Sequence, residues 1–191
     1  AAAGRANDIE IRGFSQRLNA AAQRHDSLLC VGLDPDPTLF PLALRQEGGA
    51  EEAIIRFNTG IIDATSDLVS AYKPNLAFYL AHGKSGVAAL EETRRRIPRD
   101  IPVILDAKVG DVGSTAEAYA TAYFDTWDFD AVTVNPYLGE DSLEPFMRRG
   151  DRGVIVVCKT SNRGSGDLQD LAVPGGDRGE PFYMAVADRV A

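Results

Sequence analysis

Short apolar runs alternate along this chain with longer segments of helical periodicity, and this alternation leaves few possible folds. The apolar runs cover residues 28–33, 69–74, 102–107, 130–135 and 153–158. Amphipathic helices are predicted over 51–68, 87–97 and 116–125, and another over 181–191 with Pro181 near its first turn. Strands that are apolar throughout are typical of a parallel sheet buried on both faces. The sequence therefore predicts an α/β protein made of repeated βα units.

Two architectures accommodate such units, an open doubly wound sheet and a closed (β/α)8 barrel. Polar residues stand at the carboxyl ends of all the predicted strands: Asp34, Lys73, Asp106 with Lys108, Asn135 and Lys159. A barrel builds its active site from the ends of several strands, whereas an open sheet concentrates its ligand at one switch point. The pattern therefore favours an α/β fold of the (β/α)8 TIM barrel type, of which this chain carries about the first five βα units.

The length indicates one domain but an incomplete barrel. The 191 residues are 45% hydrophobic, which suffices for a single core over 1–191. A complete barrel has eight strands in about 250 residues, and the Gly-rich segment 160–180 is predicted to be a long loop. An open five-stranded parallel sheet would leave an exposed edge and an unclosed core. We therefore expect a C-terminally truncated part of a longer protein rather than a shortened relative.

Charge and cysteine content exclude some functions. The chain has 20 basic and 28 acidic residues, a net charge of −8 and a pI near 4.8, which argues against a nucleic-acid or anionic-membrane partner. No apolar run approaches the ~18 residues of a membrane span. Cys30 and Cys158 lie in strand-like runs, and we expect buried, reduced thiols in a cytoplasmic protein.

Common cofactor motifs are not satisfied. The Gly-Lys-Ser sequence at 83–85 resembles part of a phosphate-binding P-loop, but Phe78 stands where that motif needs a glycine. His25 and His82 are far apart in sequence and outside any metal-ligand spacing, so we expect no metal site from them.

The densest group of charges is Asp-x-Lys-x-x-Asp, formed by Asp106, Lys108 and Asp111. In a regular strand, residues 106 and 108 point to the same face, so their carboxylate and ammonium would project together. A buried ion pair that locks the loop is one interpretation. Lys73, at the end of the preceding strand, favours another. Desolvating four charges costs several kcal/mol per ion, which makes a poor stabilising device but a reasonable preorganised electrostatic site.

Four segments in order carry a resemblance to a known family. They are "AYKPNLAFY" (71–79), "DAKVGDVGSTAEAYA" (106–120), "VNPYLGEDSLEPF" (134–146) and "CKTSNRGSGDLQ" (158–169), preceded by "VGLDPDP" (31–37). Together they resemble orotidine 5′-monophosphate decarboxylases of the bacterial type-2 branch, from about residue 14 to 190. The resemblance implies a (β/α)8 barrel that acts as a homodimer, binds the nucleotide orotidine 5′-monophosphate, and converts it to uridine monophosphate and carbon dioxide in pyrimidine biosynthesis without metal or cofactor.

The resemblance also implies residue roles. Lys73, Asp106, Lys108 and Asp111 correspond to the family's charged catalytic tetrad, in which the last aspartate is donated across the dimer interface.

Three further positions match residues that bind the substrate. Asp34 matches a ribose-binding aspartate, Thr115 a threonine that contacts the ligand across the interface, and Ser161 a serine that hydrogen-bonds the pyrimidine ring.

The match departs from the family in one respect. The family holds the substrate phosphate with a Gln-bearing loop and an Arg from the last strands, and this chain has no counterpart of them. Two alternatives remain: a metal-dependent sugar-phosphate decarboxylase or aldolase of the same superfamily, and a catalytically inactive fragment or relative. The first would need a metal-binding acid near the second strand, where this chain has Lys73.

Overall fold

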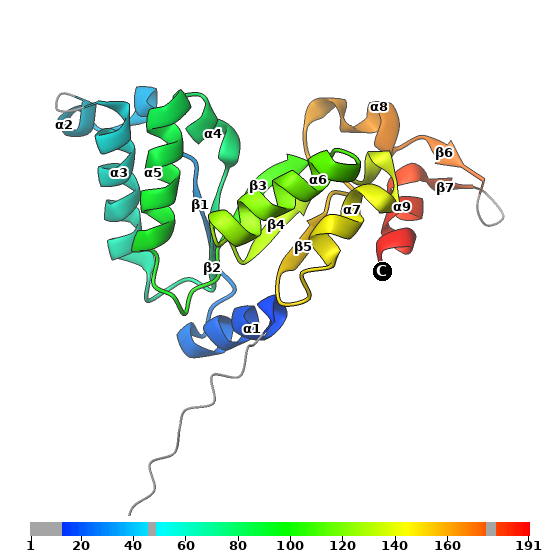
Figure 1. Ribbon diagram of the computed structural model, residues 1–191, viewed down its shortest axis with the longest axis horizontal. Coiled ribbons are helices and arrows are strands. Elements are labelled where there is room, and N and C mark those ends of the chain that lie inside the picture. Colours follow the sequence, from blue (N-terminus) through cyan, green and yellow to red (C-terminus); the bar gives the residue numbers. More distant parts are fainter. Residues whose placement is uncertain (1–12, 46–48, 175–178) are drawn as a thin grey trace, which may run out of the picture.

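The computed structural model describes residues 13–45, 49–174 and 179–191 (Figure 1). Its centre is a row of parallel strands: β1 (Cys30–Leu33), β2 (Ala71–Pro74), β3 (Ile104–Val109), β4 (Ala131–Val134) and β5 (Gly153–Val156). β1 pairs with β2, and β4 lies between β3 and β5. Isolated parallel bridges, Tyr72 to Val103 and Asn75 to Asp106, join the two groups. All five predicted strands are confirmed, with ends shifted by a few residues.

The strands stand side by side in the order in which the chain makes them. A doubly wound sheet reverses its order at a switch point, whereas a barrel adds each new strand on the same side. Within the described residues the order β1 to β5 contains no reversal. The sheet therefore has the topology of the first part of a barrel.

The structure also contains helices and shorter helical segments. The helices are α1 (Phe14–His25), α2 (Leu42–Arg45), α3 (Ala50–Thr65), α4 (Leu76–Leu80), α5 (Gly83–Arg96), α6 (Gly113–Ala120), α7 (Glu140–Met147), α8 (Gly166–Gln169) and α9 (Phe182–Val190). The 3-10 segments are η1 (Pro37–Leu39), η3 (Pro136–Leu138) and η4 (Arg163–Ser165), and η2 (Thr121–Thr126) is π-helical. The predicted helices correspond to α3, α5, α6 with η2, and α9.

One face of the strands forms the main core. Leu33, Tyr72, Leu105 and Val132 point to this face, are fully buried, and pack among the helices. α3 and α5 run side by side over β1 and β2, and α6 and α7 lie over β3 to β5 (Figure 1). Because side chains alternate along a strand, the residues between these core positions face the opposite, inner side.

α1 covers the inner side at the amino ends of the strands. Phe14 and Leu18 pack against a small buried cluster of Ala71, Ile104 and Ala131. A Cβ added to Gly153 would come within 2.4 Å of the Phe14 ring, so only glycine fits beneath it. In Figure 1 α1 lies below the strands, at the end opposite to the α6 amino terminus.

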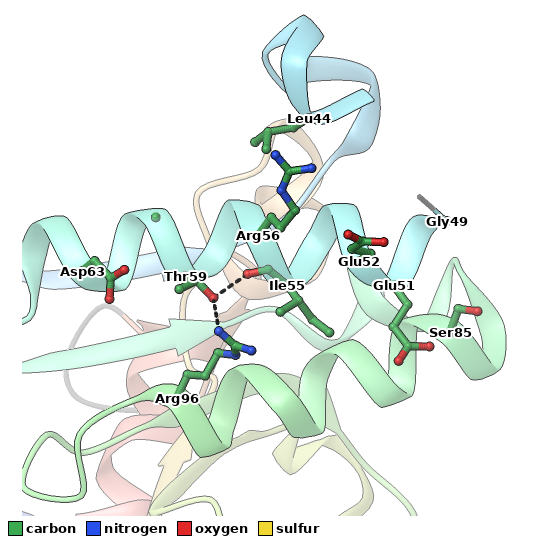
Figure 2. A pocket seen from close by; sticks show the side chains of 11 residues that line it. Leu44, Gly49, Glu51, Glu52, Ile55, Arg56, Thr59, Asp63, Ser85 and Arg96 are labelled. Carbon is green, nitrogen blue, oxygen red and sulfur yellow. Dashed lines mark hydrogen bonds between the residues drawn. The ribbon is translucent and has the colours of Figure 1, made fainter. Parts of the chain in front are cut away.

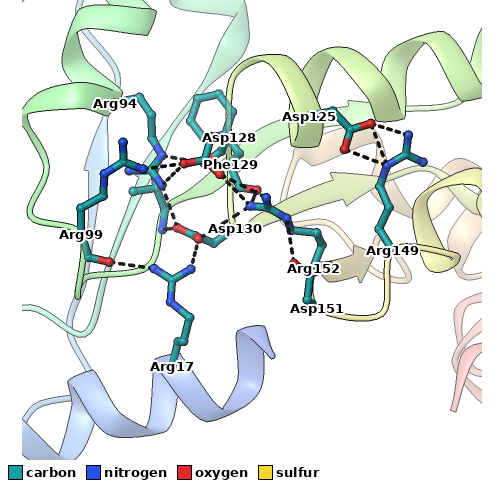
Figure 3. Close-up of polar contacts among 11 residues, drawn as sticks. Arg17, Arg94, Arg99, Asp125, Asp128, Phe129, Asp130, Arg149, Asp151 and Arg152 are labelled. Carbon is teal, nitrogen blue, oxygen red and sulfur yellow. Dashed lines mark hydrogen bonds and ion pairs between the residues drawn. The ribbon is translucent and has the colours of Figure 1, made fainter. Parts of the chain in front are cut away.

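A cluster of arginines and aspartates fixes α1 in this position (Figure 3). Asp130, directly before β4, is 2% exposed and pairs with Arg17 of α1 and Arg94 of α5. Its Oδ2 also accepts a hydrogen bond from the amide of Val103 at 2.8 Å. Asp128 binds Arg152, with Nη2 and Oδ1 3.1 Å apart, and also Arg94 and Arg99. These charges tie α1 and α5 to the strands at the end that a barrel uses for stability.

The segment 160–180 is not the simple loop that was predicted. It contains η4, α8 and β6 (Ala172–Val173), which pairs antiparallel with β7 (Glu180–Pro181). The amide of Phe182 donates to the carbonyl of Leu171 at 2.8 Å and closes this hairpin. Two-residue strands leave no periodicity in a Gly-rich sequence, so the pattern concealed them.

Helix α6 begins at Gly113, after an N-cap at Val112 that makes no side-chain cap hydrogen bond. The expectation that both cysteines are buried is wrong. Cys30 is exposed and Cys158 half-buried, although both are free. Cys30 and the core residue Leu33 lie on opposite faces of β1, so Cys30 faces the inner side. There burial raises the pKa of its thiol, and the charge of Lys73 opposes that shift.

Among the helices of the described residues, none has the length and apolar character needed to cross a bilayer.

Candidate active site

The inner side of the sheet carries a compact group of charges at its carboxyl end. Asp106 is 7% exposed, and its two oxygens face two different lysines. Lys73 Nζ of β2 lies 3.0 Å from Oδ2, and Lys108 Nζ lies 2.5 Å from Oδ1. The lysine side chains are 33% and 52% exposed, so solvent reaches the group from the open end. Three of the four predicted catalytic residues, Lys73, Asp106 and Lys108, therefore meet, with the carboxylate held between two ammonium groups.

Asp106 and Lys108 meet because β3 is irregular, not because it alternates regularly as predicted. Leu105 pairs with Val132, but the next pair along the ladder is Val109 with Val134. The extra residues form a bulge, and Lys108 within it has a φ of 46°, in the left-handed region. Residues other than glycine rarely adopt this backbone conformation. Backbone strain of this kind concentrates at functional sites.

Thr133 is the member of this group that sequence reasoning missed. It lies on β4, and its Oγ1 donates to Asp106 Oδ1 at 2.9 Å. The same oxygen accepts the amides of Ala107 and Lys108, at 3.0 and 2.9 Å. The available signal was its position: Thr133 is the only polar residue in β4 and alternates with the apolar Val132 and Val134. Period-two alternation would have placed it on the inner side with Asp106.

The hydrogen bonds decide the charge state of Asp106. Burial alone would raise the pKa of this carboxyl, but donors from Lys108, Lys73 and Thr133 outweigh burial and lower the pKa below its usual value. Asp106 is therefore a fixed negative charge at neutral pH. Lys73 pairs with it from the neighbouring strand β2.

The remaining predicted site residues lie around this group. Asp34 directly follows β1 and is exposed, and Ser161 is exposed in the segment after β5. Asp111 is half-buried in the loop before α6, where its Oδ1 accepts the amide of Val112 at 2.8 Å. Within the described residues no hydrogen bond or ion pair connects Asp111 to Asp106 or Lys108. Thr115 is exposed on α6.

Two other polar residues at strand ends have structural partners. Asn135 accepts the amide of Tyr137 at 3.0 Å and caps η3. Lys159 pairs with Asp170, with 2.5 Å between Nζ and Oδ1, and lies 5.5 Å from the centre of the Tyr183 ring. Within the described residues, no hydrogen bond or ion pair connects either side chain to Lys73, Asp106 or Lys108.

A cavity of about 850 Å³ lies elsewhere, on the outer helical layer between α3 and α5 (Figure 2). Arg96 donates to Thr59 Oγ1 at 3.2 Å there, and Glu51, Glu52 and Asp63 line the same space. Its charges are mixed and its walls are helices, so it is separate from the strand ends. No group of three or more His, Cys, Asp or Glu suited to a metal ion occurs within the described residues.

Fold and site together define the class of protein. Parallel strands in barrel order carry a Lys–Asp–Lys group at their carboxyl ends, where (β/α) barrel enzymes place their active sites. Residues 27–184 match the orotidine 5′-phosphate decarboxylase / HUMPS family. The chain belongs to this family, and the expected fold, the first part of a (β/α)8 barrel, is confirmed.

Individual relatives are similar over nearly the whole chain. An orotidine 5′-phosphate decarboxylase of Thermomicrobium roseum is 54% identical over 176 residues, which cover 92% of this chain and 61% of the relative. A second, from Roseiflexus castenholzii, is 54% identical over 175 residues and 62% of its own length. The chain thus spans about three fifths of the length of these relatives.

Solved structures give the same result. The structure of Leishmania donovani OMP decarboxylase superposes with a TM-score of 0.80 at 47% identity, over 93% of this chain and 64% of that one. A Toxoplasma gondii structure described as a putative orotidine-monophosphate-decarboxylase gives a TM-score of 0.85 at 41% identity, over 93% and 58%.

Proposed function

We propose that the full-length protein decarboxylates orotidine 5′-monophosphate to uridine 5′-monophosphate and carbon dioxide. Family membership supports this proposal. The observation that carries it is the carboxylate of Asp106, held charged between Lys73 and Lys108 at the open end of the strands.

The charged group fits the demands of the reaction. When the bond between C6 and the carboxylate breaks, its electron pair stays on C6 and carbon dioxide leaves. Lys108 stabilises the developing carbanion and then donates a proton from Nζ to C6, after which the neutral amine regains a proton from water. Lys73 keeps Asp106 in register beside the reacting carboxylate.

Repulsion between Asp106 and the substrate carboxylate contributes only part of the effect. At ~4 Å and an effective dielectric constant of ~20, two such charges repel by about 4 kcal/mol. Enzymes lower barriers by up to about 23 kcal/mol. Stabilisation of the carbanion by the Lys108 ammonium therefore has to supply a further share.

The half-buried position of Asp111, before α6, and the exposed position of Thr115, on α6, suit a site shared between two copies. We propose a homodimer in which both residues enter the partner's site, while Asp106 and Lys108 serve their own. This is supported by the carboxylate of Asp111, which is not paired with either lysine within the described residues. Asp34 would bind the ribose and Ser161 the pyrimidine ring. We further propose that the reaction needs no metal or cofactor and takes place in the cytoplasm.

The proposal is tested by assaying the full-length gene product for loss of orotidine 5′-monophosphate and release of carbon dioxide. Lys108→Ala should lower kcat by at least a thousandfold, because it removes both the proton donor and the stabilising charge. Lys84→Ala, on the exposed first turn of α5, is the matched control and should leave kcat within twofold. Activity that survives exhaustive chelation would count against the metal-dependent alternative. A full-length protein without decarboxylase activity would refute the proposed function.

A further inference from the structure

The hydroxyl of Thr133 uses its entire hydrogen-bonding capacity within the site. A hydroxyl has one proton to donate and two lone pairs to accept. The amides of Ala107 and Lys108 occupy the lone pairs, at 3.0 and 2.9 Å. The proton is therefore directed at Asp106 Oδ1, 2.9 Å away, and that oxygen has to act as an acceptor. Thr133 is 9% exposed, so water has little access to compete for these bonds.

The same hydroxyl completes the bulge in β3. Leu105 faces Val132 and Val109 faces Val134, so residues 106–108 stand opposite the single residue Thr133. In a regular ladder, backbone carbonyls would accept the amides of residues 107 and 108. The side chain of Thr133 accepts them instead, and in doing so it holds Lys108 at a φ of 46°. That backbone conformation is what brings the Lys108 ammonium to within 2.5 Å of Asp106.

We propose that Thr133 is a positioning residue, which fixes the Lys108 backbone and the Asp106 carboxylate in the arrangement that decarboxylation requires. The inference rests on the proposed function, and it adds a role that family membership does not supply. Thr133 acts through its two neighbours and is not itself a proton donor to the substrate.

The kinetic test compares Thr133→Val with Thr133→Ser in the full-length gene product. Valine keeps the shape but loses all three hydrogen bonds, whereas serine keeps the hydroxyl. A hydrogen bond to a charged group is commonly worth a factor of about ten to one hundred. We expect Thr133→Val to lower kcat by that factor with KM for orotidine 5′-monophosphate within threefold, and Thr133→Ser to stay within threefold in both. Unchanged kcat in the valine variant, or equal losses in both, would overturn the proposal.

A second measurement does not depend on activity. Hydrogen exchange of the Ala107 and Lys108 amides should be slow in the unmodified protein and at least tenfold faster in Thr133→Val. The amide of Val157, which donates to the Val134 carbonyl at 2.9 Å, is the internal control and should keep its rate. Fast exchange of both bulge amides in the unmodified protein overturns the proposal even if the valine variant does not fold. If exchange behaves as expected but the unmodified protein does not decarboxylate the substrate, the proposed function fails and the structural role of Thr133 stands.

Discussion

Lys108 turns back onto Asp106 in the same strand, with 2.5 Å between Nζ and Oδ1, and it does so with its backbone at a φ of 46°. Left-handed backbone costs a residue with a Cβ roughly 1–2 kcal/mol. The chain thus places strain at the residue whose ammonium is proposed to do the chemistry, as strained functional sites do. Among substitutions that remove the ammonium, one that relieves the strain should therefore give the more stable protein.

Replacing Lys108 by glycine should give a more stable protein than replacing it by alanine. Both changes remove the ammonium, but only glycine adopts a φ of 46° without steric cost, so the difference should be about 1 kcal/mol. Urea unfolding measures it. The same pair at Lys84, in helix α5, should show the reverse order because glycine disfavours helices. Equal stabilities of the two Lys108 variants would mean that the site is not strained.

Replacing Asp130 should lower the free energy of unfolding far more than replacing an exposed acidic residue. It is 2% exposed and faces Arg94, itself 6% exposed, so Asp130→Ala leaves a buried guanidinium with fewer partners. Breaking a buried pair typically costs about 3–5 kcal/mol. Asp151→Ala removes a 49% exposed carboxylate from Arg152 and should change the free energy of unfolding by less than about 0.5 kcal/mol. Similar urea midpoints for the two variants would contradict the assigned role of Asp130.

Two glycines within helices should respond oppositely to alanine. A Cβ on Gly86 of α5 would lie 1.8 Å from the Tyr79 carbonyl oxygen, so Gly86→Ala should destabilise by roughly 1–3 kcal/mol. A Cβ on Gly60 of α3 would meet nothing within 4 Å, and Gly60→Ala should stabilise by about 0.5–1 kcal/mol. Thermal unfolding of the pair tests the close approach of α4 and α5. A loss of stability in both variants, or in neither, would rule it out.

The sequence predicted the strands because each is a short, largely apolar run that alternates with segments of helical periodicity. Leu105 and Val132 point to the helices, and Asp106 and Thr133 point inward, as alternation requires. The sequence did not predict the bulge. Residues 106–108 are extra only relative to the facing strand β4, and the sequence of β3 alone does not encode how the two strands pair. The bulge, and not the regular alternation of side chains along a strand, brings the Lys108 ammonium to Asp106. The meeting of Lys73 with Asp106 was predictable, since both end neighbouring strands.

The errors in sequence interpretation share a cause. The β6–β7 hairpin is held by pairing between residues about eight apart, and its two-residue strands are too short to show a period. Cys30 was expected in the core because its run is apolar, yet it occupies an inward position beside Lys73. Composition identifies a strand, but which face is covered depends on what packs against it. The single-domain organisation over 1–191 stays a prediction.

The depressed pKa of Asp106 makes its contribution to stability dependent on pH. Burial opposes the shift, and the donors Lys108, Lys73 and Thr133 produce it. A carboxyl whose folded pKa lies below its unfolded value of about 3.9 stabilises the fold above that pH and loses this contribution as the pH falls through the folded pKa. The difference in free energy of unfolding between the unmodified protein and Asp106→Asn should therefore be constant from pH 7 to about 5 and shrink below about 4. Urea titrations at each pH measure it, and a difference that stays constant to pH 2.5 would exclude the shift.

Complementation between inactive variants tests whether the site is shared by two subunits. Lys108→Ala and Asp111→Ala should each be inactive as homodimers, because every site lacks one charged group. If Asp111 serves the partner's site, a mixed dimer contains one site with both residues intact and one with neither. Mixing equal amounts after subunit exchange gives half mixed dimers, each with one of two sites active, so about a quarter of the unmodified activity should return. Mixing Lys108→Ala with Lys73→Ala is the control: both residues belong to the same subunit's site, so no mixed dimer regains an intact one. Absence of recovery in the test pair would place Asp111 in its own subunit's site, whereas recovery in the control would contradict the assignment of Lys73 and Lys108 to one subunit's site.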